Sequence, residues 1–346
     1  MRGFKESRAS PGEDPATSLS VNSSVLAGGN ADVGTRNASL SKGDFLGEEC
    51  VFGAEDFLSR VFRGTPVARL RILVASALVF IICFSGLAGT AQATTARSTL
   101  APPAVHAKAA ILVDMNTGRV LYSHNANARR RMASTTKIMT ALLALDTLPL
   151  DRVVTVSSRA AEVGAWSLGL KPGDRLTVKQ LLHAALVYSA NDAAFALAEA
   201  SSGSMEAFVR KMNREASKLG LSNTHYVNPD GLDAPGQFSS ARDLAILARH
   251  AMKNGEFRRI VATVTYGITL PGHSQSFVFR NINKLLGTVS GVTGIKTGST
   301  NQAGVCLVAS GTENGKSVIS VVLGEANVTQ TWSDSKALLT YGFERE

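Results

Sequence analysis

The sequence predicts a mixed α/β domain over residues 102–346, built on an antiparallel sheet to which both ends of this segment contribute strands. Two observations predict this fold class. Apolar and β-branched residues interrupted by turn signals occupy residues 109–128 and again 294–326, as in hairpin strands. The residues between these two regions carry apolar side chains at helical spacing. The middle of the segment is therefore expected to be helical.

The strands are expected in two hairpins. The first runs through "AAILVDMNTGRVLYSHNANA", with a turn at Asn116-Thr117-Gly118. The second includes "GVCLVASGTENGKSVISVVLGEA", with a turn at residues 313–316, and follows a further strand that contains "GIKTGST". Each turn signal has strand-forming residues on both sides, which is the usual mark of paired neighbouring strands.

The helices are expected in three central segments and one final segment. The central ones contain "TVKQLLHAALVYSANDAAFALAEAS", "SMEAFVRKMNREASKLG" and "SSARDLAILARHAMKN". Thr177, Ser204, and Ser240 or a neighbour of it precede the apolar pattern of each and are the expected N-caps. The last segment, "TWSDSKALLTYGF", is expected to be a closing helix.

The first 93 residues are not expected to belong to the domain. Residues 1–66 are rich in Ser, Gly, Asn, Asp and Glu, a composition that predicts disorder. Arg69 and Arg71 then precede a charge-free apolar run over residues 72–91, and Ala91-Gln92-Ala93 follows. This is the layout of a secretory signal peptide, so residues 67–93 predict export to the periplasm or another extracytoplasmic space.

The position of this signal, well inside the chain, allows two explanations. Residues 1–66 can be a misassigned start, with translation beginning near Val67, which the good fit to the export pattern favours. Alternatively, the extension is real and residues 72–91 remain as an anchor, since about 20 apolar residues span a bilayer. Membrane attachment is expected only if this run is not cleaved.

Charge and composition exclude several classes of function. Residues 1–93 hold nine basic and nine acidic side chains, so the whole net charge of +9 lies in residues 94–346. This surplus favours polyanionic cell-wall material or a membrane surface, or serves solubility alone. No Lys/Arg-rich run is interleaved with aromatic residues, which argues against nucleic acid. The six histidines are scattered without ligand spacing, so neither a metal nor another cofactor is expected.

Only Cys306 remains among the three cysteines once residues 1–93 are removed. A single cysteine cannot form an internal disulfide, so the hydrophobic core must hold the domain together. Cys306 lies in "GVCLVASG", where a buried strand position is expected.

A candidate nucleophile lies in "RMASTTKIMTALLAL", at the start of an apolar helical run. Ser134 and Lys137 stand at i and i+3, which places two helical side chains on one face. A serine hydroxyl needs a base, and no Gly-x-Ser-x-Gly elbow surrounds any serine. Lysine can act as that base when burial and neighbouring cations hold its amine neutral. The pair is therefore a candidate for acyl transfer.

Two further motifs follow in the chain. "YSANDAA" places Ser189 and Asn191 at a break between helical runs, and "GIKTGST" places Lys296, Thr297 and Gly298 in a strand. The set resembles the penicillin-binding-protein and serine β-lactamase superfamily, whose signatures are Ser-x-x-Lys, Ser-x-Asn and Lys-Thr-Gly. Longer segments, among them "LKPGDRLTVKQLLHAALVYSANDAA", look like the low-molecular-mass D-alanyl-D-alanine carboxypeptidases of peptidase family S11. The resemblance covers about residues 102–346.

The resemblance implies a penicillin-binding-protein/β-lactamase-like α/β (α+β type) sandwich. An antiparallel five-stranded sheet would have helices on both faces and a helical lobe inserted between its early and late strands. Many family members continue into a β-rich domain and an amphipathic anchoring helix. The sequence ends at "YGFERE", where the catalytic domain would end, so both are expected to be missing.

The resemblance also implies roles for the motif residues. Ser134 would be the acylated nucleophile and Lys137 its base; Ser189 would relay a proton to the leaving amine. Asn191 would contact the substrate amide and help to position Lys137. Lys296 and Thr297 would bind the terminal carboxylate, with the charge of Lys296 helping to keep Lys137 neutral. Gly298 would let the substrate backbone approach the strand. The oxyanion hole would be formed by the backbone N–H groups of Ser134 and Ser299.

The implied activity is that of a serine-type D-alanyl-D-alanine carboxypeptidase, which trims peptidoglycan stem peptides and is acylated by β-lactams. A β-lactamase is less expected, because no Glu-x-x-x-Asn pattern follows Ser189. A DD-endopeptidase on the same scaffold remains open. So does a penicillin-binding sensor or scaffold with little turnover, although all the motif residues are intact.

Three features have no assigned role. Arg129, Arg130 and Arg131 can form a solvated face, which is expected, or attract acidic peptide. Trp166 can line a cleft or pack, and the sequence does not choose between them. The segment "NPDGLD" resembles a loop of the family, but its residues do not indicate a chemical role.

Overall fold

The structure, a computed structural model, describes residues 101–269 and 276–345. The expected disordered extension, the signal over residues 67–93 and the apolar run over 72–91 lie outside the described residues. Within the described ranges, no helix is long and apolar enough to cross a membrane.

A five-stranded antiparallel sheet forms the centre of the described fold. Its order is β2-β1-β9-β8-β7, so β1 pairs with β9 and joins the early hairpin to the late strands. The strands are β1 Ala109–Asp114, β2 Val120–His124, β7 Val292–Thr300, β8 Gly304–Glu313 and β9 Lys316–Glu325. The predicted fold class, with one sheet built from both ends of the domain, is confirmed.

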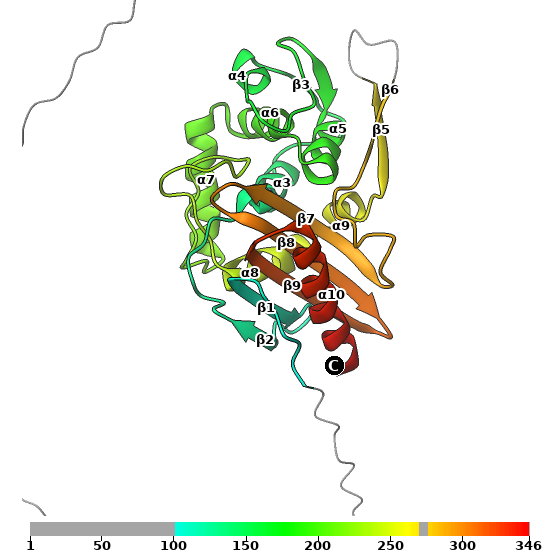
Figure 1. The fold of residues 1–346 in the computed structure, drawn as a ribbon. Coiled ribbons are helices and arrows are strands. Elements are labelled where there is room, and N and C mark those ends of the chain that lie inside the picture. The colour runs from blue at the N-terminus through cyan, green and yellow to red at the C-terminus, as the bar shows by residue number, and fades with distance from the viewer. Residues whose placement is uncertain (1–100, 270–275, 346) are drawn as a thin grey trace, which may run out of the picture. The chain divides into compact units, whose positions relative to one another are not determined.

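Helices cover both faces of the sheet because alternate side chains of its inner strands enter two different cores. On β1, Ile111 belongs to the larger core with the central helices, whereas Leu112 belongs to a second core beneath α10. Helix α10, Val328–Arg345, lies along one face (Figure 1), and α8, Ala241–Ala251, packs against the other through β1 and β9. The sequence of an inner strand that is covered on both faces is a nearly continuous apolar run, as in β1.

The helical lobe occupies the chain between β2 and β7, as predicted. Thr177, Ser204 and Ser240 cap α5, α7 and α8 by accepting a hydrogen bond from a backbone amide three residues ahead. The helical elements of the lobe, in addition to α8, are η1 Ala133–Thr136, α3 Lys137–Leu145, α4 Ser158–Ala161, α5 Val178–His183, η2 Ala184–Tyr188, α6 Asn191–Ser202, α7 Met205–Lys218 and α9 Gly255–Val261.

Two small two-stranded antiparallel sheets, which the sequence pattern did not predict, complete the lobe. Strands β3, Val153–Thr155, and β4, Arg175–Thr177, pair over three residues each. Strands β5, Thr265–Thr269, and β6, Ser276–Arg280, form a hairpin that extends beside the lobe (Figure 1).

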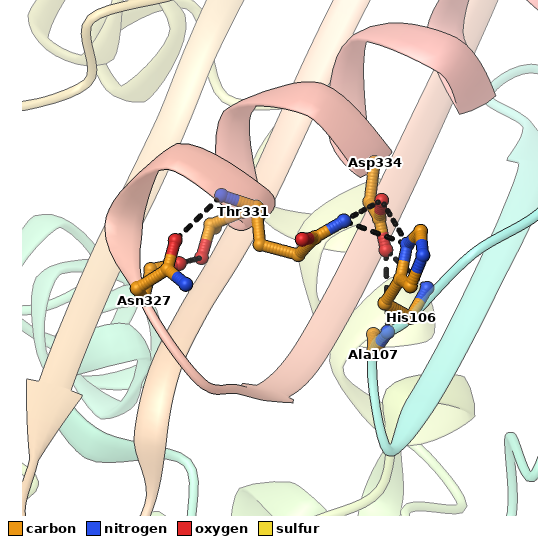
Figure 2. A network of polar contacts seen from close by, with 6 residues as sticks. His106, Ala107, Asn327, Thr331 and Asp334 are labelled. Carbon is orange, nitrogen blue, oxygen red and sulfur yellow. Dashed lines mark hydrogen bonds and ion pairs between the residues drawn. The ribbon is translucent and has the colours of Figure 1, made fainter.

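The segment that enters β1 is fastened to α10. The backbone amides of His106 and Ala107 both donate to the Asp334 carboxylate, and Gln330 contacts the His106 ring (Figure 2). Glu325, at the end of β9, is buried and hydrogen-bonds Asp334 through its carboxyl group. Burial raises the pKa of Glu325 to about 8, so at neutral pH one proton is held between the two carboxyl groups.

Candidate active site

Ser134 lies in η1, a tight 3₁₀ turn that leads directly into α3. The hydroxyls of Thr135 and Thr136 donate to the carbonyls of Met132 and Ala133 and hold this turn closed. Ala133 has a left-handed backbone, with φ of 48°, which is uncommon for a residue other than glycine. The serine is therefore held on a constrained turn and does not cap a regular helix.

Two glycines allow this turn to pack closely against its neighbours. A Cβ added at Gly298 of β7 would lie 2.7 Å from the backbone nitrogen of Ser134. A Cβ added at Gly231, which has a φ of +92°, would lie 1.9 Å from the carbonyl oxygen of Ala133. The expected role of Gly298 was to admit the substrate backbone, whereas the structure shows that its missing side chain also makes room for the serine turn.

Lys137 reaches the serine from the first residue of α3. Its Nζ lies 2.9 Å from Ser134 Oγ. The same nitrogen lies 2.6 Å from Oδ1 of Asn191 and 2.8 Å from the carbonyl oxygen of Asp230. Three oxygen atoms from three separate parts of the chain therefore surround one amine that is fully buried.

The chemistry of these three oxygens determines what the amine can do. The amide oxygen of Asn191 and the carbonyl oxygen of Asp230 only accept hydrogen bonds, so each requires an N–H from Lys137. A neutral amine has two N–H groups and one lone pair. With both N–H groups engaged, the lone pair is left for Ser134, whose hydroxyl can donate. The geometry thus suits a neutral lysine that accepts the serine proton.

Burial favours this neutral form. Desolvation lowers the pKa of Lys137 to about 8, although the nearby carboxylates of Asp230 and Asp192 oppose the shift. The Asp230 carboxyl is itself buried, which raises its pKa, and its Oδ2 has no hydrogen-bond partner among the described residues. Desolvation also lowers the pKa of Lys296 well below its usual value, and the charge of Lys137 lowers it further.

The second motif follows a π-helical turn. η2 ends at Tyr188, and Ser189 then adopts a left-handed backbone with φ of 75° before α6 begins at Asn191. The Ser189 hydroxyl accepts a hydrogen bond of 2.8 Å from Lys296 Nζ. The side-chain amide of Asn191 donates to the carbonyl of Ala165 at 2.6 Å. The break is therefore two residues long and directs both polar side chains into the site.

The third motif lies on β7, at the edge of the sheet. Lys296 is buried and donates to Ser189 and to the carbonyl of Thr297. The hydroxyl of Thr297 is buried and has no hydrogen-bond partner within the described part of the chain. Ser299, further along the strand, is exposed. Thr297 thus offers an unused hydroxyl, whereas Lys296 is already engaged with the second motif.

All the residues predicted from the motifs lie in one region, but the sequence did not identify every contributor. Asp230 and Ala165 contribute through their backbone carbonyls. Every residue type has such a carbonyl, so the sequence does not reveal this role. Asp230 belongs to the "NPDGLD" segment, so that loop contributes an acceptor for the candidate base. Asp192 accepts from the Leu170 amide and ties the loop before β4 to α6.

The arginines before the serine do not all face solvent as expected. Arg129 is exposed, and its guanidinium lies over the Phe238 ring at 4.9 Å. Arg130 is partly buried, and Arg131 donates to the carbonyl of Ala234. These contacts tie the segment before the serine turn to the loop that follows the "NPDGLD" segment. In the described ranges, no group of His, Cys, Asp and Glu side chains is arranged to hold a metal ion.

Comparison with known proteins points to one family. A family model described as D-alanyl-D-alanine carboxypeptidase, Peptidase S11, matches residues 95–327. The D-alanyl-D-alanine carboxypeptidase DacF of Bacillus subtilis is 39% identical over 69% of the chain and 62% of its own length. A D-alanyl-D-alanine carboxypeptidase of Streptomyces strain K15 is 38% identical over 74% of the chain and 93% of its own length. The chain thus spans less than two thirds of the Bacillus relative.

A solved structure leads to the same group of proteins. The crystal structure of the Streptomyces K15 DD-transpeptidase superposes with a TM-score of 0.68 at 37% identity. The superposition covers 70% of the chain and 99% of that protein. The similarity therefore spans the whole sandwich of the solved protein, including the sheet and the inserted lobe.

Proposed function

The chain belongs to the D-alanyl-D-alanine carboxypeptidase family, peptidase S11, and on that basis we propose that it removes the terminal D-alanine from peptidoglycan stem peptides. The reaction is acyl transfer through an ester on Ser134. The observation that carries this proposal is the buried Lys137 amine, 2.9 Å from Ser134 Oγ, with its other two hydrogen-bonding positions occupied by acceptors.

In the first step, Lys137 accepts the Ser134 proton as the oxygen attacks the carbonyl carbon between the two D-alanines. The tetrahedral oxyanion is stabilised by the backbone N–H groups of Ser134 and Ser299. The proximity of β7 to the serine turn at Gly298 supports this assignment, because it brings the two segments together.

In the second step, the C–N bond breaks and the leaving D-alanine amine takes a proton. Ser189 relays it: the hydroxyl gives its proton to the amine and takes one from Lys296 Nζ, which donates to it at 2.8 Å. The free hydroxyl of Thr297 receives the terminal carboxylate, beside Lys296 Nζ, which donates to the Thr297 carbonyl. One N–H of Asn191 remains for the substrate amide. Water then hydrolyses the ester.

The carboxypeptidase proposal is tested by labelling and product analysis. Fluorescent penicillin should label the chain, and peptide mapping should locate the label on Ser134. A stem pentapeptide should then release D-alanine. Ser134→Ala should lose both activities, whereas Ser217→Ala, at an exposed serine of α7, should keep them. A wild-type chain that is not labelled would refute the proposal.

The same assay separates the alternatives. Cleavage of cross-linked dimers in preference to pentapeptide would indicate a DD-endopeptidase. Transfer of the acyl group to an added amine would match the activity named for the Streptomyces K15 DD-transpeptidase. Labelling without measurable turnover would indicate a penicillin-binding sensor.

We also propose that the enzyme acts outside the cytoplasmic membrane, where its substrate lies. The signal-like residues 67–93 and the basic charge of residues 94–346 support this location. N-terminal sequencing of the mature protein should begin near Thr94. Recovery of a membrane-bound species that still carries Met1 would instead support an anchor at residues 72–91.

A further inference from the structure

Trp166 combines an exposed ring with a tightly held backbone. Its side chain is 60% exposed, and among the large apolar residues that the structure describes only Val278 is more exposed. Ala165 and Trp166 nevertheless both adopt left-handed backbones, with φ of 54° and 51°. Two consecutive left-handed residues other than glycine persist only where surrounding contacts impose them. The contacts that impose this conformation therefore indicate what the segment does.

Three hydrogen bonds fasten this pair of residues to the Ser189–Asn191 motif. The indole N–H of Trp166 donates to the carbonyl of Tyr188 at 2.6 Å. The backbone amide of Asn191 donates to the carbonyl of Trp166 at 3.0 Å. The side-chain amide of Asn191 donates to the carbonyl of Ala165 at 2.6 Å. The motif is thus held before Ser189 and again at Asn191.

These hydrogen bonds determine which way the Asn191 side-chain amide faces. An asparagine side chain has one donor nitrogen and one acceptor oxygen. Because the Ala165 carbonyl can only accept, the nitrogen must face it, and the oxygen must then face Lys137, 2.6 Å away. That oxygen occupies one N–H of the lysine and helps to leave the lone pair for Ser134.

We infer that Trp166 is a positioning residue, which fixes Asn191 and through it the orientation of the Lys137 amine. The inference rests on the proposed acyl transfer at Ser134. A role in packing alone does not account for the geometry, because residues that pack are usually buried. The ring meets Tyr188 in a tilted contact, with centroids 5.9 Å apart, and leaves most of its surface in solvent.

Trp166→Phe removes the indole N–H and keeps an aromatic ring. Without this N–H, the Ala165–Trp166 segment is no longer fixed to Tyr188, and the Ala165 carbonyl can move away from the Asn191 amide. Asn191 can then turn away from Lys137. The acylation rate constant should fall roughly tenfold or more, because small misplacements near reacting groups slow reactions by such factors. KM for the peptide should change little, because Trp166 does not contact the reacting atoms.

The pH profile provides a readout that a purely structural role would not move. The Asn191 oxygen accepts from Lys137 and so favours its charged form. Loss of this acceptor favours the neutral amine, and the acid limb of the acylation profile should therefore shift to lower pH. The other charged groups around Lys137, namely Asp192, Asp230 and Lys296, are unchanged in this variant.

The experiment compares acylation by penicillin in the wild type, Trp166→Phe and Trp332→Phe. Trp332→Phe is the control, because it replaces a partly buried tryptophan of α10. We expect the loss and the pH shift in Trp166→Phe only, with an unfolding temperature within about 4 °C of the wild type. Equal acylation rates in Trp166→Phe and the wild type would overturn the inference. So would a loss that follows a fall in unfolding temperature with no pH shift. Failure of wild-type labelling at Ser134 would instead refute the proposed function.

Discussion

At the scale of single residues, the site depends on one amine that burial keeps close to neutrality. Lys137 is a base only when its proton is absent, and its pKa of about 8 sets the pH at which that happens. A typical lysine, with a pKa of about 10.4, would be almost wholly charged at neutral pH. The three oxygens around Nζ then decide where the free lone pair lies.

The first prediction is the pH dependence of acylation in the wild type. The active form is the neutral amine, so the rate constant should rise with pH and level off above about pH 8, where Lys137 has lost its proton. Below that value it should fall by about tenfold per pH unit. Stopped-flow acylation by a chromogenic penicillin measures this profile. A rate that is flat down to weakly acidic pH would exclude Lys137 as the titrating base.

The second prediction concerns the free hydroxyl of Thr297. Thr297→Val keeps the shape of the side chain but removes its donor, so kcat/KM for a peptide with a free C-terminus should fall by roughly tenfold or more, as expected for a lost hydrogen bond to a charged group. Activity on a C-terminally amidated peptide should change much less. Thr265→Val, at an exposed position of β5, is the control. Equal losses on both peptides would count against carboxylate binding by Thr297.

At the scale of elements, the site is the meeting point of η1, the start of α6 and β7. Gly298 is the contact between two of them, since the space beside its Cα is filled by the backbone of the serine turn. A methyl group there cannot be accommodated by moving a flexible side chain. The strand or the turn must shift.

The third prediction follows from this contact. Gly298→Ala should lower the free energy of unfolding by about 1–3 kcal/mol, as overpacking does, and should reduce acylation strongly because Ser134 is displaced. Gly267→Ala is a matched strand control, since its Cβ would meet only the Val278 side chain at 3.8 Å. Urea unfolding and penicillin labelling measure the two effects. A Gly298→Ala variant with wild-type stability and labelling would contradict the proposed close contact.

The main elements could be predicted from sequence because each has a strong local signal. The strands β1, β8 and β9 are long apolar runs, and the helices α5, α7 and α8 begin at capping residues that the structure confirms. The β3–β4 sheet and the β5–β6 hairpin were not predicted. Strands of three residues, such as β3 and β4, leave too little pattern, and the β5–β6 hairpin exposes apolar side chains such as Val278 on its surface.

The site was predictable only where side chains carry the chemistry. Ser134, Lys137 and the later motif residues are of the reactive types that the resemblance implies. The carbonyls of Asp230 and Ala165 could not be predicted, because any residue supplies a carbonyl and only the fold aims it. Trp166 was left undecided for a similar reason, since its hydrogen bonds are with the backbone of a segment more than twenty residues away.

At the scale of the whole molecule, Asp334 of the closing helix α10 holds the segment that enters β1, and the buried Glu325 at the end of β9 hydrogen-bonds Asp334. The pKa of Glu325 is raised from 4.5 to about 8 in the folded state. The stability it contributes is therefore complete below pH 4.5 and is lost as pH rises through about 8. Burial raises the pKa of Asp334, but hydrogen bonds from Glu325 and the His106 backbone lower it by more, so its pKa lies below the usual value. The contribution of Asp334 to the stability of the fold is therefore lost only as the pH falls into the acid range.

The fourth prediction uses this difference in sign. Glu325→Gln resembles the protonated acid and cannot lose a proton, so its unfolding temperature relative to the wild type should increase as pH rises from 4.5 to about 8. Glu344→Gln, at an exposed position of α10, should show no such trend. Thermal unfolding followed by circular dichroism across this pH range is the measurement. Parallel curves for Glu325→Gln and the wild type would show that Glu325 does not hold a proton in the folded state.

The whole fold has one central chemical consequence, which is a neutral lysine beside a serine. Lys137→Arg tests it most directly, because arginine keeps a positive charge and a long side chain but does not lose its proton in proteins. The measurement is the acylation rate constant with penicillin and with stem pentapeptide, beside Lys218→Arg at an exposed position of α7. We predict that Lys137→Arg is not measurably acylated at any pH at which it stays folded, whereas Lys218→Arg matches the wild type. Acylation of Lys137→Arg at near the wild-type rate would contradict the account.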